Sequence, residues 1–252
     1  MQSNRKEGNV KENKYDEQIF FMKYSEMDCS KKGLEGAGEW SELKKMLPDF
    51  KDKRVLDLGC GYGWHCKYAA EHGAAFVLGT DISNKMLETA KQKNSHNRIT
   101  YQCSAMEDLK FPAETFDIVI SSLAFHYVKD FEQLMKHIAI WLKPGGDLIY
   151  SVEHPVFTSY GTQDWCYDAN GKILHFPVDN YYYEGKREAI FLGEKVIKYH
   201  RTLTTYLNSL LKNGFILQNF TEPQPPEEMM ELAGMKDEMR RPMMLLVSAR
   251  KK

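Results

Sequence analysis

Short β-rich runs alternate with helical patterns along the middle of the chain. Apolar and β-branched residues gather at residues 54–59, 74–81 and 99–103. Between these runs, residues 63–73 and 83–93 carry apolar side chains at the three- and four-residue spacing of an amphipathic helix. This alternation predicts consecutive β-α-β units and therefore a parallel sheet.

The same rhythm continues through the next stretch of the chain. A fourth β-rich run at residues 116–122 is followed by an amphipathic pattern at 130–143, a Pro-Gly-Gly turn and a fifth run at 147–153. Ser83 and Asp130 directly precede helical patterns. Because either side chain can accept from a free N–H in the first helical turn, both are predicted N-caps.

The rhythm breaks from about residue 154 to 199, which is rich in Tyr, Trp, Gly and Asp and contains one hairpin-like run with a Gly-Glu turn. We interpret residues 154–199 as an insertion after the fifth strand. A helix from about residue 201 to 212 and strands at 215–223 and 242–250 close the chain. No strong crossover helix joins these two strands, so the last is predicted to be antiparallel.

The beginning of the chain has two parts. Residues 1–14 are polar, lack apolar periodicity and are predicted to be a disordered lead-in. Residues 15–50 carry aromatic residues and a helical pattern that starts near Trp40 and stops at Pro48, which predicts an N-terminal cap segment. Residues 15–252 are therefore expected to form a single domain.

Composition excludes several classes of protein. A hydrophobic fraction of 42% with 27% charged residues is typical of a globular chain, and a formal net charge of -1 provides no basic field for nucleic acid or an acidic membrane. The five cysteines form no C-x-x-C pair, which argues against a disulfide framework or a zinc knuckle. No run resembles a signal peptide or a membrane span, so we expect a cytoplasmic protein.

The most informative motif joins the first strand to the first helix of the sheet. It contains Asp57 followed by Gly59, Gly61 and Gly63. Such glycines let the backbone approach a ligand, and the helix N-terminus favours a negative group. A dinucleotide site would place its third glycine where Trp64 stands.

A second acidic residue, Asp81, ends the second strand, at the sheet edge where open α/β proteins bind ligands. Together with the acid and three glycines before it, this pattern resembles motif I and the following acidic position of class I S-adenosylmethionine (SAM)-dependent methyltransferases. The resemblance implies a Rossmann-like fold: a seven-stranded, mostly parallel α/β sheet with helices on both faces. It also implies SAM as cofactor, with Asp81 accepting from the ribose hydroxyls.

The likeness covers most of the chain. Residues 103–109 are similar to the region around the adenine, and residues 116–123 to the strand whose end faces the methyl group. Many relatives carry Asp where this chain has Ala105, so the adenine N6 contact would fall to backbone groups or to Glu107. The resemblance implies these cofactor-binding residues: Tyr24, Asp57, Gly59, Cys60, Gly61, Gly63, Trp64, Asp81, Ile82, Met86, Ala105, Met106, Glu107, Ser121 and Leu123.

Candidate catalytic and substrate-binding residues follow the fourth and fifth strands. His126 and Tyr127 come just after the fourth, and Glu153 and His154 after the fifth, so all four should reach the same sheet edge. His154 is the first candidate for a general base and His126 the second. Phe20, His200 and Arg201 are further candidates for substrate binding.

The flanks resemble a bacterial subgroup of type 11 methyltransferases, which implies a small-molecule methyl acceptor. A nucleic-acid methyltransferase is disfavoured, because residues 121–124 read Ser-Ser-Leu-Ala where enzymes that methylate exocyclic amines carry an Asn/Asp-Pro-Pro-aromatic motif. No convincing set of acidic metal ligands is present. A SAM-binding sensor without transferase activity remains open, as does the choice between monomer and homodimer.

Overall fold

The computed structural model describes residue 11 and residues 13–252 of the chain. Its centre is a seven-stranded sheet in the order β10-β11-β5-β4-β1-β2-β3. The strands are β1 (Arg54–Leu58), β2 (Phe76–Asp81), β3 (Ile99–Cys103), β4 (Phe116–Ser122), β5 (Leu142–Glu153), β10 (Phe215–Thr221) and β11 (Met244–Lys251).

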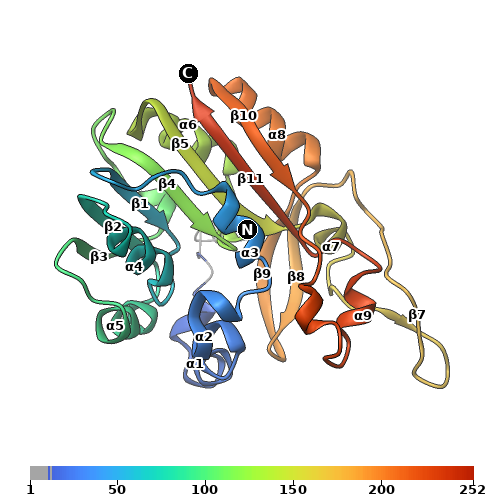
Figure 1. Ribbon diagram of the computed structural model, residues 1–252. Coiled ribbons are helices and arrows are strands. Elements are labelled where there is room, and N and C mark those ends of the chain that lie inside the picture. Colours follow the sequence, from blue (N-terminus) through green and yellow to red (C-terminus); the bar gives the residue numbers. More distant parts are fainter. Residues whose placement is uncertain (1–10, 12) are drawn as a thin grey trace, which may run out of the picture.

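Strand direction within this sheet agrees with the sequence pattern. The pairs β1-β2, β1-β4, β2-β3 and β4-β5 are parallel, whereas β11 is antiparallel to both β5 and β10. The last strand lies between its two neighbours in Figure 1. The predicted mostly parallel sheet with an antiparallel last strand is therefore confirmed.

Helices cover both faces of the sheet. One face carries α3 (Trp40–Met46), α4 (Trp64–Glu71) and α5 (Asn84–Lys93), and the other α6 (Phe131–Trp141) and α8 (Leu203–Lys212). A hydrophobic core lies on each face of the sheet, and alternate residues of β5 point into one or the other. Ile149 packs with the first group of helices and Tyr150 with the second. Within the described part of the chain, no helix combines the length and apolar character needed to cross a bilayer.

Helix starts follow local capping chemistry. Ser83 accepts from the Met86 N–H and Asp130 from the Gln133 N–H, so both predicted N-caps are confirmed. The last large helix, α8, begins at Leu203 rather than at residue 201. Thr202 is its N-cap, accepting from the Thr205 N–H, which leaves Arg201 outside the helix.

The N-terminal cap segment contains more helix than the sequence pattern predicted. It comprises η1 (Lys14–Asp16), α1 (Gln18–Ser25), α2 (Asp28–Lys32) and η2 (Gly33–Gly36), and Figure 1 shows α1 and α2 beyond the carboxyl ends of the parallel strands. Asp16 anchors it to α5, because its Oδ1 accepts from the Ser83 hydroxyl at 2.6 Å and from the Lys85 N–H at 3.2 Å. Most of the predicted lead-in, residues 1–10 and 12, lies outside the described residues.

The insertion after β5 contains α7 (Pro155–Ser159), β6 (Cys166–Tyr167), β7 (Ile173–His175) and the hairpin of β8 (Gly185–Phe191) and β9 (Glu194–His200). Its turn is formed by Leu192 and Gly193 rather than by Gly193 and Glu194, since the first two have φ of 54° and 78°. Two-residue hairpin turns of this kind need positive φ at both positions. The hairpin contacts α1 through Lys23, which donates to the Leu192 carbonyl at 2.9 Å.

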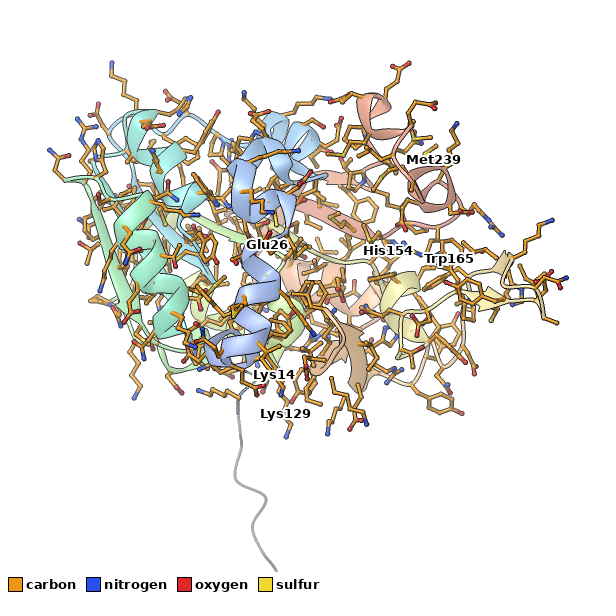
Figure 2. All side chains as sticks on the ribbon, turned by 90° about the horizontal axis from the view of Figure 1, so that it is seen from below. Lys14, Glu26, Lys129, His154, Trp165 and Met239 are labelled. Carbon is orange, nitrogen blue, oxygen red and sulfur yellow. The ribbon has the colours of Figure 1, made fainter. Side chains whose placement is uncertain are left out.

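The segment that joins β10 to β11 is the third, after the cap segment and the insertion, that lies beyond the ends of the strands. It was not predicted from the sequence. It contains η5 (Glu227–Met229) and α9 (Met235–Glu238). The Arg241 guanidinium stacks at 4.4 to 4.9 Å from the ring centres of Phe157, Trp165 and Phe176, which lie in the insertion. Figure 2 looks onto this side of the molecule, with Glu26 of the cap segment near the middle and Trp165 to one side.

Candidate active site

A cavity of about 480 Å³ lies at the carboxyl ends of the parallel strands. The loops after β1, β2 and β4 form its floor, and residues of the cap segment, the insertion and the segment before β11 form its walls. Its volume lies in the usual range for a small-molecule site, and its position is the one where open α/β sheets bind ligands.

The glycine loop between β1 and α4 has two different requirements for glycine. Gly59, Gly61 and Gly63 all have positive φ, at 72°, 53° and 76°. A Cβ on Gly59 would lie 2.4 Å from the Ala124 Cβ, and one on Gly63 would lie 2.2 Å from the Tyr101 hydroxyl. A Cβ on Gly61 would meet only Met86, at 3.4 Å. The outer two glycines therefore permit packing, whereas Gly61 keeps the backbone open beside the cavity.

Asp81 holds the glycine loop and the start of α5 in place while lining the cavity. Its Oδ2 accepts from the Gly61 N–H and its Oδ1 from the Ser83 N–H, both at 2.9 Å. Burial raises the pKa of this carboxyl. Each oxygen can still accept a further bond, so the arrangement suits a ligand that carries hydroxyl groups.

Three predicted cofactor residues lie behind the cavity surface rather than on it. Asp57 is buried and accepts from the Cys66 thiol at 3.1 Å, and burial raises its pKa to about 7. The Ser121 hydroxyl donates to the Leu58 carbonyl at 2.8 Å, and Gly63 packs on Tyr101. These residues shape the loop and do not line the cavity.

The remaining predicted cofactor residues line the cavity. They are Tyr24, Gly59, Cys60, Gly61, Trp64, Asp81, Ile82, Met86, Ala105, Met106, Glu107 and Leu123. The indole Nε1 of Trp64 is buried and has no hydrogen-bond partner among the described residues. Since unpaired buried donors are costly, this N–H is a candidate for contact with a ligand.

His154, the first candidate for the general base, contacts residues outside the cavity. Its ring is buried and does not line the cavity. Nδ1 accepts from the Val156 N–H at 3.0 Å at the start of α7, and Nε2 lies 2.7 Å from Glu222 Oε1. His154 is therefore the N-cap of α7 and, contrary to the expected position of a general base, lies outside the cavity lining.

Three proposed substrate-binding residues also lie outside the cavity lining. Phe20 is fully buried in a small core with Ala189 and Val196. His200 contacts the Thr158 hydroxyl at 2.7 Å and the Tyr181 carbonyl at 2.9 Å. The Arg201 guanidinium donates to the carbonyls of Val128, Lys129 and Tyr199. Packing and backbone contacts occupy these side chains, so the structure does not place them where the predicted role in substrate binding requires.

A compact polar cluster faces the cavity from the side of the insertion. It joins Glu153 to two residues that sequence reasoning did not select, Gln163 and Lys198. Lys198 Nζ lies 2.5 Å from Glu153 Oε1 and 2.9 Å from Gln163 Oε1, and Gln163 Nε2 donates to Glu153 Oε2 at 2.7 Å. Although burial opposes ionisation, Lys198 and the other partners hold the pKa of Glu153 below its ordinary value.

His126 and Tyr127 lie beside this cluster, as the sequence predicted, and both line the cavity. Burial lowers the pKa of His126 to about 4, so the ring is uncharged at neutral pH. Its Nδ1 accepts from the Glu153 N–H at 3.4 Å. The Tyr127 hydroxyl lies 3.2 Å from that of Tyr15 in the cap segment.

One sequence signal pointed to Lys198. Val196, Lys198 and His200 alternate along β9, and all three are buried. A lysine at an inward position of a strand is unusual unless its ammonium has a partner. No local signal identifies Gln163, because only the fold of the insertion brings it to Glu153.

The cavity fits a nucleoside joined to an amino acid, as SAM is. Asp81 can accept from ribose hydroxyls, Gly61 leaves the backbone accessible, and the unpaired Trp64 N–H can donate to an anionic group. Among the described residues, no group of three or more His, Cys, Asp or Glu is arranged to hold a metal ion.

Comparisons with known proteins agree with this geometry. Residues 56–150 match the family model described as a methyltransferase domain. A crystal structure from Listeria monocytogenes, assigned as an S-adenosylmethionine-dependent methyltransferase, is 55% identical over 87% of this chain and 99% of that chain, with a TM-score of 0.84. An S-adenosylmethionine-dependent methyltransferase from Mesorhizobium loti is 41% identical over 87% of this chain and all of that one, with a TM-score of 0.80.

A more distant similarity concerns the central part of the chain. The ubiquinone biosynthesis O-methyltransferase of Coxiella burnetii is 37% identical over 112 residues, which are 44% of this chain and 47% of that protein. The two solved structures are matched over nearly their whole length at 55% and 41% identity. The chain therefore belongs to the SAM-dependent methyltransferases, enzymes that transfer the methyl group of SAM.

Proposed function

We propose that this enzyme methylates a small, largely apolar molecule that carries one polar group, and that the acceptor binds in the part of the cavity next to β9. The observation that carries the proposal is the continuity of the cavity. The same hollow that is lined by Gly61 and Asp81 extends to the Glu153, Gln163 and Lys198 cluster.

The walls of this part support a mostly apolar acceptor. They are formed by Phe157, Ile190, Phe191, Met243 and Met244. Small-molecule sites commonly combine such apolar walls with a few converging polar groups that set orientation. The polar cluster would then hold the nucleophilic atom of the acceptor.

The cluster also suggests how the nucleophile is prepared. Bound SAM supplies an electrophilic methyl group, and the acceptor must lose a proton when its nucleophile is an alcohol or phenol. Glu153 is held ionised by Lys198, which is the state that a proton acceptor needs. Lys198 and Gln163 act as positioning residues, and the neutral His126 ring is available to orient the acceptor's polar atom.

The energetics of the ion pair favour a functional role. The side chains of Lys198 and Glu153 are only 2% and 15% exposed. Removing two charges from water costs free energy that offsets much of their mutual attraction. A buried ion pair therefore contributes little net stability to the folded protein. We therefore attribute it to acceptor recognition.

The partial likeness to a ubiquinone biosynthesis O-methyltransferase supports a small-molecule acceptor, since that name describes such chemistry. The formal net charge of -1 gives no support to nucleic acid as the acceptor. All five cysteines are free thiols, which supports a reducing compartment such as the cytoplasm. A sensor that binds SAM without transferring methyl groups would lack turnover.

Turnover tests the proposal. The protein is incubated with SAM and fractions of a bacterial metabolite extract, and the release of S-adenosylhomocysteine is followed. At least one small-molecule fraction should support release. Release with nucleic acid or protein fractions alone would overturn the acceptor class, and binding of SAM without release in any fraction would favour the sensor.

A matched pair of lysines tests the cluster. Lys198→Met should reduce turnover of the active fraction while leaving the affinity for S-adenosylhomocysteine unchanged, because Lys198 lies in the proposed acceptor part. Lys195→Met is the control, since Lys195 lies on the same strand and its side chain is 75% exposed. Equal turnover in the two variants would exclude the Lys198 cluster from acceptor binding.

A further inference from the structure

Glu39 is a buried carboxylate that lines the cavity and was not selected from the sequence. It directly precedes α3 and is only 4% exposed. Its Oε1 accepts from the Ser122 hydroxyl at 3.1 Å, at the end of β4. This carboxylate therefore stands at the edge of the sheet where the glycine loop and β4 meet the cavity.

Glu39 lacks a cationic partner within the described part of the chain. Of the lysines that line the cavity, Lys11 pairs with Asp108 and Lys198 with Glu153. His65 also lines the cavity, but burial lowers its pKa to about 4 and leaves it uncharged. A buried carboxylate without a counter-charge is costly, and burial raises the pKa of Glu39 accordingly.

A complementary donor lies on α4, the helix that follows the glycine loop. Among the residues that the structure describes, none contacts the buried Trp64 Nε1–H by a hydrogen bond. It lies at the start of α4, where the helix N-terminus also favours negative charge. A Cβ at Gly33 would lie 3.1 Å from the Trp64 indole, so the cap segment packs closely on that ring. The Trp40 and His65 rings, adjacent in sequence to Glu39 and Trp64, lie 5.7 Å apart and join the two segments.

We propose that Glu39 binds the α-ammonium of the methionine half of SAM and that the Trp64 Nε1–H binds its α-carboxylate. The methionine end carries a positive and a negative group on one carbon. These match a carboxylate without a cationic partner and an N–H without a hydrogen-bond partner, as far as the described residues go, in one cavity. Asp57, the acid of the glycine motif, does not line the cavity: its Oδ2 accepts from the Cys66 thiol, and its Oδ1 is buried without a hydrogen-bond partner among the described residues. Glu39 is the carboxylate that faces the cavity. The inference rests on the cofactor of the family and is independent of the proposed acceptor.

Calorimetric binding of three ligands separates the two contacts. S-adenosylhomocysteine keeps both groups, decarboxylated S-adenosylhomocysteine keeps only the amine, and 5′-methylthioadenosine lacks both. Glu39→Gln should weaken binding of the first two ligands by about ten- to a hundredfold and leave the third unchanged. Trp64→Phe should weaken S-adenosylhomocysteine alone, because only that ligand carries the carboxylate.

The control variants test whether the effect is specific to Glu39, whether each variant is folded, and whether Asp57 binds the ammonium instead. Glu42→Gln alters a half-buried residue of α3 that pairs with Lys45 and does not line the cavity, so it should leave all three affinities unchanged. Thermal unfolding checks that each variant is folded, and Glu39→Asp takes the place of Glu39→Gln in the same comparison if the latter does not fold. If Glu39→Gln weakened the binding of all three ligands equally, Glu39 would have only a structural role. Unchanged binding in Glu39→Gln, with weakening in Asp57→Asn, would assign the ammonium to Asp57 instead.

Discussion

At the scale of single residues, carboxylates in and around the cavity have distinct tasks set by their surroundings. Asp81 ties two N–H groups together at the cavity surface, and Asp57 supports the glycine loop from behind. The negative charge of Glu153 is balanced by the ammonium of Lys198, whereas Glu39 has no cation beside it among the described residues. Charge state and partners, rather than residue type, therefore separate their roles.

Replacing Asp81 by Ala should weaken binding of S-adenosylhomocysteine by about ten- to a hundredfold, because the ribose hydroxyls lose a carboxyl group as acceptor. Isothermal calorimetry measures the change. Asp16→Ala controls for loss of the α5 anchor, since Asp16 also contacts Ser83 but does not line the cavity. An unchanged dissociation constant in Asp81→Ala would show that this carboxylate only braces the loop.

Asp57 should make the stability of the ligand-free protein depend on pH. Its folded-state pKa of about 7 lies above the ordinary 3.8, so the folded protein holds a proton that the unfolded chain has lost between these values. The contribution to the free energy of unfolding therefore falls as pH rises from about 4 to 7, by up to about 4 kcal/mol.

Asp57→Asn removes this titration, so its stability relative to wild type should grow from pH 4 to 7 and then level off. The difference between the two proteins is the quantity to measure by chemical unfolding. His65 and His126, with pKa values lowered to about 4, titrate over the same range with the opposite sign in both proteins. A difference that stays constant with pH would contradict the assignment.

At the scale of elements, the segment after β5 shows why His154 lies away from the cavity: it caps the short helix that follows it. His154 follows a strand that ends at the ligand edge, but Pro155 begins a helix and the ring turns to cap it. Glu222, from the segment after β10, then contacts the other ring nitrogen. His126, which follows β4, keeps its place at the cavity.

Exchange of each histidine for Ala distinguishes capping from catalysis. His154→Ala should lower the free energy of unfolding by about 1 kcal/mol through the lost cap, with little change in turnover of folded protein. His126→Ala should instead lower turnover of the active metabolite fraction while leaving S-adenosylhomocysteine binding intact. The opposite pattern, with turnover lost only in His154→Ala, would restore His154 as the base.

At the scale of the whole molecule, three segments far apart in the sequence enclose one side of the sheet. The cap segment contributes Tyr15 and Tyr24 to the cavity, the insertion Ile190 and Lys198, and the segment before β11 Met243. Their mutual contacts, such as Lys23 with Leu192, join the cap segment to the hairpin. Figure 1 shows these segments beyond the ends of the strands.

The insertion and the cap segment are predicted to act together as a lid. Hydrogen exchange should show joint protection of residues 20–24 and of β8 and β9 when S-adenosylhomocysteine and the active metabolite fraction are both added. The ligand-free protein and S-adenosylhomocysteine alone are the comparisons. Protection limited to residues 57–107 would argue against a lid, and a homodimer interface would then explain the exposed aromatic residues of the insertion, such as Tyr182.

The sheet and the glycine loop were predictable because their signals are local. Strand runs, helical periodicity and the caps Ser83 and Asp130 each depend on neighbours a few residues away. Asp81 could be placed at the cavity because parallel strands share one carboxyl edge. The structure places His154, Arg201 and Phe20 outside the cavity lining. His154 caps the helix that follows it, whereas Arg201 and Phe20 contact segments far away in the sequence, which no local pattern reveals.

What the sequence determined by itself is the α/β sheet with its antiparallel last strand, the SAM-binding family and the edge at which the ligand binds. Local propensity, hydrophobic period and motif spacing carry that information along the chain. Only the tertiary structure decided which polar side chains face the cavity. The contacts of Lys198 with Glu153 and of Glu39 with Ser122 join residues 45 and 83 positions apart, and chain folding alone brings them together.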